Sequence, residues 1–222
     1  MSTAPRRHRR RVLIVDDQRL LADSLCLALR LEGLEPVVAP VTNRNDLMEL
    51  VRADPPALVL LDLALGDALG DGVDLVAPCV EAGSRVLVLS GTTDTMWVAA
   101  ALEQGACAAI DKGIPFDQLL TRVLQAAHGE PVLRSAERQR LLDQLRSHRA
   151  SRARDLAPYE RLTPREQQVL RALGRGLTVS RIAEGWVVSE ATVRSQVHAV
   201  LCKLDVRSQL EAVAAASRVG WL

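Results

Sequence analysis

The chain has 222 residues, 48% of them hydrophobic and 25% charged, which is ordinary for one large or two smaller globular domains. Aromatic residues make up only 2%, and this excludes a platform of stacked aromatic rings for single-stranded nucleic acid. The net charge of +1 hides an acidic excess in residues 1–127 and a basic excess in residues 128–222, so we expect two modules, the second suited to a polyanionic partner.

The pattern of residues divides the chain into four parts. They are a basic tail at 1–11, a first domain at 12–127, a partly helical linker at 128–158 and a second domain at 159–222. The tail is expected either to contact DNA phosphates or to be a solvated end. The apolar run after it is too short for a signal peptide, and no run in the sequence is long enough to span a membrane. We therefore expect a cytoplasmic protein without a membrane segment.

The first domain alternates short apolar runs with longer amphipathic segments. Strands are expected at 12–15, 34–41, 57–61, 85–89 and 108–110. Helical spacing occurs between and after them, at 20–31, 46–52, 73–81, 95–104 and 116–127. Strands that are apolar throughout are typical of a parallel sheet covered on both faces. The pattern therefore predicts an α/β doubly wound five-stranded parallel sheet.

Polar residues follow the expected strands where a doubly wound sheet gathers its functional groups. These residues are Asp16, Asp17, Asp62, Ser90 and Lys112. Carboxylates that converge on one rim repel one another unless a cation holds them, and oxygen ligands of this kind suit Mg²⁺. An aspartate nucleophile with a metal, a lysine and a hydroxyl indicates phosphoryl transfer.

Four segments resemble the receiver domain of two-component response regulators, a flavodoxin-like fold. They are VLIVDDQ (12–18), LVLLDLAL (58–65), VLVLSG (86–91) and AAIDKG (108–113). The resemblance implies that Asp62 accepts a phosphoryl group from a cognate sensor histidine kinase, with Lys112 and Ser90 as partners of that group. It also implies a Mg²⁺ site made of Asp16, Asp17, Asp62 and the main-chain carbonyl of Ala64.

The sequence departs from that family's pattern at three places. Ala109 stands where an aromatic residue usually couples phosphorylation to the outer surface, and Gly66 replaces a proline. The loop at 66–72 is about two residues longer than usual. Its acidic residues, Asp67 and Asp71, are expected to be solvated rather than further metal ligands. These departures leave open whether the receiver is switched by phosphorylation or serves in dimerisation or ligand sensing.

The linker loses the alternation of strands and helices. A helix is possible at 133–145, and the Arg-rich stretch at 147–158 is expected to be an exposed connector. One alternative to a solvated tether is a helix that pairs with a second subunit through Leu141, Leu142 and Leu145.

The second domain begins with a helix start signal, since Thr163 precedes Pro164 and stands three residues before Glu166. Helices are expected from there to about 174, then at 179–186, 190–204 and 208–217. The tight turn at 185–189 predicts an all-α, four-helix helix-turn-helix domain. Its third helix presents Arg194, Ser195 and His198, which could read bases in the major groove or simply form a solvated face.

Two segments of this domain resemble the LuxR-type DNA-binding domain: LTPREQQVLRALGRGLTVSRIAE (162–184) and VSEATVRSQVHAVLCKLDVRSQLEAV (188–213). Joined to a receiver, they resemble the NarL/FixJ family of response regulators. The resemblance places Arg194, Ser195 and His198 at base- or phosphate-facing positions, and makes Thr192, Thr178, Val179 and Lys203 candidate contacts to the DNA backbone. Trp186 and Val187 replace the usual Leu-Gly of the turn.

Three functions of different classes are compatible with these features. The resemblance favours a transcription factor that binds double-stranded promoter DNA as a homodimer when Asp62 is phosphorylated. A second hypothesis is an orphan regulator that binds DNA without phosphorylation control, through ligand- or concentration-dependent dimerisation. The third is a phosphatase that forms an aspartyl-phosphate, but such enzymes need a second aspartate where this chain has Ala64. We therefore expect no enzyme.

Overall fold

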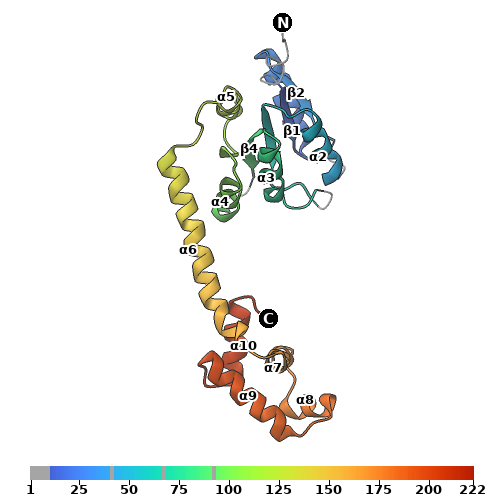
Figure 1. The fold of residues 1–222 in the computed structure, drawn as a ribbon, viewed down its shortest axis with the longest axis vertical. Helices are drawn as coiled ribbons and strands as arrows, with labels where there is room; N and C mark the ends of the chain where they lie inside the picture. Colours follow the sequence, from blue (N-terminus) through green and yellow to red (C-terminus); the bar gives the residue numbers. More distant parts are fainter. Residues whose placement is uncertain (1–10, 41–42, 67–68, 92–93) are drawn as a thin grey trace. The chain divides into compact units, whose positions relative to one another are not determined.

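The computed structural model describes residues 11–40, 43–66, 69–91 and 94–222. It divides into two compact units, Met1–Leu145 and Arg146–Leu222, each of which is described by itself (Figure 1). Most of the basic tail expected at residues 1–11 lies outside the described residues. In the part of the chain that is described, no helix is both long enough and apolar enough to cross a membrane.

The first unit is built on a five-stranded parallel sheet in the order β2-β1-β3-β4-β5. Its strands are β1 (Arg11–Val15), β2 (Glu35–Val38), β3 (Leu58–Asp62), β4 (Arg85–Ser90) and β5 (Ala108–Asp111). This order confirms the predicted doubly wound, flavodoxin-like fold. The edge strand β2 is shorter than expected, since its pairing with β1 runs only from Arg11–Glu35 to Ile14–Val38.

Helices cover both faces of this sheet. They are α1 (Arg19–Leu31), α2 (Arg44–Ala53), α3 (Val73–Glu81), α4 (Thr95–Glu103) and α5 (Phe116–Ala127). Helices α1 and α5 pack on one face, and α2, α3 and α4 pack on the other. Successive side chains of a strand point to opposite faces, so the fully buried strands supply both cores. This explains why the strands are apolar without alternation.

The linker forms one continuous helix, α6 (Ser135–Glu160), and the boundary between the two units falls within it. The stretch at 147–158, expected to be an exposed connector, is therefore helical, and its side chains from 147 to 155 are exposed. That stretch is rich in Arg and Ala, which favour a helix, and its single proline, Pro158, lies in the last turn. Leu141 and Leu142 pack against the core under α2, α3 and α4, so they are engaged within the chain rather than free for a partner subunit.

Arg138 ties the start of α6 to the first unit. Its guanidinium donates hydrogen bonds to the carbonyl oxygens of Leu102 (2.6 Å) and Ala106 (2.7 Å), at the end of α4. The carbonyl of Leu102 also accepts the bond from Gly105 N (3.2 Å) that closes the end of α4, and a cation at this end complements the helix dipole. Residues on both sides of Arg138 are thereby held against α4.

The second unit contains α7 (Pro164–Gly174), α8 (Val179–Trp186), α9 (Glu190–Leu204) and α10 (Gln209–Arg218), together with the end of α6. The predicted capping box is present: Thr163 Oγ1 accepts from Glu166 N (3.3 Å), and Glu166 Oε2 accepts from Thr163 N (2.7 Å). The helix-turn-helix formed by α8 and α9 confirms the predicted fold of this unit.

Candidate functional site

The first candidate site lies at the carboxyl ends of the strands in the first unit. Asp16 and Asp17 follow β1, and Asp62 is the last residue of β3. The structure brings one carboxylate oxygen from each of the three to within 4.8 Å of the others. Asp16 and Asp62 are buried, whereas Asp17 is exposed. The predicted cluster of carboxylates is therefore assembled by the sheet itself.

Lys112, the first residue after β5, forms ion pairs with two carboxylates of this cluster. Its ammonium nitrogen lies 2.8 Å from Asp62 Oδ2 and 2.8 Å from Asp16 Oδ2. All three side chains are nearly inaccessible, with 7% of Lys112, 3% of Asp62 and none of Asp16 exposed. Removing one partner of an ion pair so shielded from water leaves an uncompensated buried charge and is strongly destabilising.

Backbone amides orient the two buried carboxylates. Gln18 N donates to Asp16 Oδ1 (2.8 Å), and Ala64 N donates to Asp62 Oδ1 (3.1 Å). The structure thus assigns the amide of Ala64 to the site, while the predicted use of its carbonyl as a metal ligand stays a prediction. With Oδ1 held by Ala64 and Oδ2 by Lys112, the Asp62 carboxylate has one defined orientation.

Asp16 carries the unbalanced charge of the cluster. Burial raises the pKa of its carboxyl, and the hydrogen bonds and charge of Lys112 and the amide of Gln18 only partly oppose that rise. Among the described residues, its buried Oδ2 is contacted by the ammonium of Lys112, at 2.8 Å, and that ammonium is shared with Asp62. A divalent cation would satisfy such an oxygen, so the residues present fit Mg²⁺ held by Asp16, Asp17 and Asp62.

Ser90 completes the rim from β4. Its side chain is buried, and its carbonyl oxygen accepts from Lys112 N at 2.9 Å. That bond connects the ends of β4 and β5, so Ser90 and Lys112 are positioned together. All residues that the sequence placed at this rim therefore meet at the same edge of the sheet.

The long loop after Asp62 folds back on the acceptor strand. Ala64 and Asp71 form an isolated antiparallel bridge, and Gly72 N donates to Leu63 O (3.1 Å). A Cβ on Gly72 would lie 2.5 Å from the carbonyl oxygen of Asp62, so only glycine fits there. Sequence reasoning missed this role, because a glycine before a helix carries no sign of what approaches it.

The loop at 66–72 contains two acidic residues, Asp67 and Asp71, and the structure describes only Asp71. Asp71 Oδ1 accepts from Val73 N (2.9 Å) at the start of α3, and Asp71 does not belong to the carboxylate cluster. That Asp71 is a solvated loop residue rather than a further metal ligand stays a prediction. Asp67 lies outside the described residues.

The second candidate site is the outer face of α9. Arg194, Ser195 and His198 are exposed there, while Val193 and Val197 on the opposite face are buried in the core of the second unit. Ser189 caps the helix, accepting from Thr192 N (3.1 Å). The hydroxyl of Thr192 is itself bonded to that of Ser189 (2.8 Å), beside the first turn of α9.

Arg194 is held by a weak local partner. Its guanidinium lies 2.8 Å from Glu190 Oε2, but the two side chains are 70% and 48% exposed. An exposed pair four residues apart on a helix stabilises by only about 0.3–0.5 kcal/mol. Arg194 can therefore exchange this partner for a guanine edge or a phosphate.

Thr178 and Val179 begin α8. The side chain of Thr178 caps the helix by accepting from Arg181 N, at 3.4 Å. Val179 is half-buried and packs against the core, which leaves its main chain as the part suited to a DNA phosphate. Both residues keep their predicted positions at a helix N-terminus, where anions bind.

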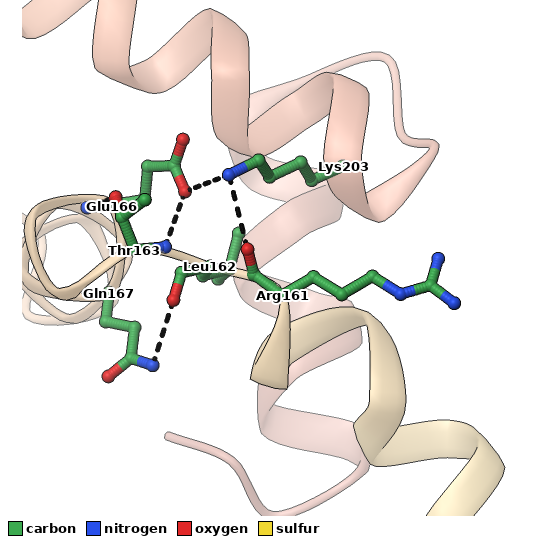
Figure 2. A network of polar contacts seen from close by, with 6 residues as sticks. All are labelled: Arg161, Leu162, Thr163, Glu166, Gln167 and Lys203. Carbon is green, nitrogen blue, oxygen red and sulfur yellow. Dashed lines mark hydrogen bonds and ion pairs between the residues drawn. The ribbon is translucent and has the colours of Figure 1, made fainter.

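Lys203 occupies a network at the start of α7 (Figure 2). Its ammonium donates to Glu166 Oε2 (2.7 Å) and to the carbonyl oxygen of Arg161 (3.2 Å). The sequence placed Lys203 at the DNA backbone, but it joins α9 to the cap of α7, a role that only the tertiary fold reveals. Any phosphate bound by Lys203 would compete with Glu166.

Glu166 predicts a pH dependence for the second unit. Burial alone would raise the pKa of its carboxyl, but hydrogen bonds from Lys203 and Thr163 and the charge of Lys203 together lower that pKa below its ordinary value of 4.5. The ionised form is thus stabilised by folding. We expect this stabilisation to be complete above pH 4.5 and to be lost as pH falls through the lower pKa of the folded state.

The measurement is urea unfolding between pH 6 and 3 in a Trp97→Phe background, where emission comes from Trp186 and Trp221 of the second unit. Glu166→Gln should start less stable and lose this part of the pH dependence. An equal slope in Glu166→Gln and its parent would contradict the role of the network.

Val187 predicts a gain in stability. It adopts a left-handed conformation (φ 54°) between α8 and α9, and its side chain is 92% exposed, so little packing compensates for the strain. Val187→Gly is expected to stabilise the second unit by about 1 kcal/mol. Val187→Ala keeps a Cβ in the same conformation and is the control. The same urea titration decides: a gain no larger for glycine than for alanine would contradict strain at this turn.

Comparisons with known proteins identify both domains of the chain. Residues 12–124 match the family described as "Response regulator receiver domain", and residues 160–216 match "Bacterial regulatory proteins, luxR family". The chain is 31% identical to the nitrate/nitrite response regulator protein NarL of Escherichia coli K12 over 202 residues, covering 90% of this chain and 92% of that one. It is 30% identical to a probable transcriptional regulatory protein NarL of Mycobacterium tuberculosis H37Rv over 214 residues, 96% of each chain.

A solved structure of the RcsB response regulator of Salmonella typhimurium is also similar. The match covers 95% of this chain and 99% of that one, at 21% identity and a TM-score of 0.49.

Proposed function

Because the chain belongs to the NarL/FixJ family of two-component response regulators, with a receiver domain and a LuxR-type DNA-binding domain, we propose that phosphorylation of Asp62 controls its binding to promoter DNA. The observation that carries the proposal is the buried ion pair of Lys112 with Asp62 and Asp16. An aspartate that only caps a helix needs no buried lysine beside it, whereas an aspartate that accepts a phosphoryl group does.

The chemistry at Asp62 is a phosphoryl transfer. A carboxylate oxygen of Asp62 attacks the phosphorus of the donor, the acyl-phosphate bond forms, and the bond to the donor breaks with its electron pair on the leaving group. Lys112, already 2.8 Å from Asp62 Oδ2, pairs with an oxygen of the new phosphoryl group. Ser90 offers its hydroxyl from the end of β4. When bound, Mg²⁺ neutralises charge on the phosphoryl oxygens.

The remaining partners follow from the two domains. The phosphodonor in the cell is a sensor histidine kinase, and the acceptor of the signal is double-stranded promoter DNA read by α9 in the major groove. A homodimer would engage two half-sites. Promoter DNA lies in the cytoplasm, where we place the protein. We expect no turnover of phosphate esters, since Ala64 stands where a phosphatase of this chemistry needs an acid.

The proposed Mg²⁺ site makes a prediction about thermal stability. Mg²⁺ at a hundred times its dissociation constant is expected to stabilise the receiver by about 2.7 kcal/mol. Asp17→Asn should abolish that shift and change the stability without metal little, because Asp17 is exposed. Asp117→Asn removes another exposed carboxylate, on α5, and is the control. Thermal melts with and without Mg²⁺ test this, and an equal shift in both variants would exclude Asp17 as a ligand.

The acceptor is tested by intact mass. The protein is incubated with Mg²⁺ and a small phosphodonor such as acetyl phosphate, beside an Asp62→Ala variant. A phosphoryl-sized gain that is absent from the variant supports Asp62 as the acceptor. No gain with either a small donor or a histidine kinase would favour the orphan regulator, for which the small Ala109 is the supporting feature.

A further inference from the structure

Helix α1 is apolar on two sides, and the receiver core explains only one of them. Ala22, Leu25 and Leu29 are buried beneath the helix. On the outer side, Leu20 is 84% exposed, Leu27 64% and Leu31 81%. Three large apolar side chains on one exposed helix face indicate an interaction surface rather than scattered apolar residues.

The spacing of these leucines is that of a helix-pairing seam. With Ser24, they stand at 20, 24, 27 and 31, so successive positions are separated by four, three and four residues. That alternation keeps side chains on one stripe that packs against a second helix. The small, half-buried Ser24 in the middle of the stripe lets another helix approach closely. The occupant that this stripe fits is therefore an α-helix.

We propose that this seam, made of Leu20, Ser24, Leu27 and Leu31, binds the α1 of a second copy of the chain, antiparallel and about a two-fold axis. The axis passes between Ser24 and Leu27. It places Leu20 against Leu31 of the second copy and Ser24 against Leu27 of the second copy. Each half of the seam is thus covered by the other half, as an interface between identical subunits requires.

Charge selects this orientation. Asp23 and Arg30 are exposed and stand seven residues apart, so they lie on the same flank of the seam. In the antiparallel pair, Asp23 faces Arg30 of the second copy, and the two-fold axis repeats the contact. Within the described parts of the chain, neither side chain has an ion-pair partner. In a parallel pair Asp23 would face the neighbourhood of Ala28, and the attraction would be absent.

The role of this α1 pair in DNA binding rests on the homodimer proposed above, but the pairing does not. The pairing itself is measured without DNA, so its failure leaves the acceptor at Asp62 and the DNA-binding helix untouched. Conversely, a dimer through α1 could exist in a protein that Asp62 does not control.

The test is sedimentation equilibrium of the full chain, with and without phosphodonor, at micromolar concentrations. Leu27→Glu is expected to weaken the dimer by about tenfold or more, because it buries a charge in the seam. Leu210→Glu is the matched control, since Leu210 is 79% exposed on α10 and should leave the dimer unchanged. Far-ultraviolet circular dichroism verifies that both variants fold.

Charge reversal tests the orientation. Asp23→Arg and Arg30→Asp each place like charges together and should weaken self-association, by about tenfold. The double variant restores both pairs and should recover the dimer. Mixing the two single variants should yield heterodimers in preference to either homodimer. The Asp23→Arg chain has arginine at both positions and the Arg30→Asp chain has aspartate at both, so opposite charges meet only in the heterodimer.

Two results would overturn the proposal. One is a wild-type chain that stays monomeric in both conditions, or that dimerises equally well with Leu27→Glu. The other is a double charge variant as weak as the single ones, with no heterodimer in the mixture, which would exclude the antiparallel pair.

Discussion

Replacing Lys112 with Met is expected to lower the free energy of unfolding of the first unit by about 3 kcal/mol, because the change leaves two buried carboxylates without their counter-ion. Asp16 and Asp62 are almost inaccessible, and Lys112 is the cation found within 2.8 Å of both. Removing one partner of a buried ion pair destabilises far more than the pair contributes in net terms. The effect should be largest without Mg²⁺.

Hydrogen exchange of β1 and β3 amides under increasing urea, in a buffer containing a chelator, would measure the change in this unit. Adding Asp16→Asn to Lys112→Met should recover part of the loss, because one of the two unpaired charges is then gone. A loss below about 1 kcal/mol, the range of a surface pair, would show that water reaches the carboxylates and that Lys112 does not hold them.

Replacing Arg194 with Ala is expected to weaken binding to a preferred DNA duplex by about ten- to a hundredfold, the effect of losing a bidentate contact to a base. Arg194 lies on the exposed face of α9, and within the described parts of the chain it pairs with the exposed Glu190. Breaking the ion pair with Glu190 therefore costs little free energy. Nearly all of the free energy that Arg194 gains by contacting DNA then contributes to the binding affinity.

The duplex is obtained by selection from a random library, and affinity is measured by fluorescence anisotropy at two salt concentrations. Arg122→Ala removes the same charge from an exposed position on α5 and is the control. A loss that is equal on selected and unselected duplexes would assign Arg194 to a phosphate. A loss no greater than that of Arg122→Ala would remove it from the interface.

The parallel sheet explains why the first site could be predicted from sequence. Asp16, Asp62 and Lys112 are far apart in the chain, but each ends or follows an apolar run. Parallel strands end at a common edge, so the order of runs along the chain already implies that the three side chains meet. The capping residues Thr163 and Ser189 were equally readable, because a cap acts on its own helix.

Features that depend on contacts between distant elements could not be read in this way. The close approach of Gly72 to Asp62, the bonds of Arg138 to the end of α4 and the pairing of Lys203 with Glu166 each join segments that no local pattern connects. The continuous helix α6 was missed for a different reason. A polar, Arg-rich stretch has the composition of a connector, although its residues are good helix formers.

The central claim is that phosphorylation of Asp62 controls binding to DNA. Its most direct test is the affinity of the full-length protein for its selected duplex, before and after treatment with Mg²⁺ and a phosphodonor, for wild type and Asp62→Asn. We expect the wild type to bind about fivefold or more tightly after treatment and the variant not to respond. A wild type whose intact mass shows phosphorylation but whose affinity is unchanged, or a variant that responds equally, would contradict the claim.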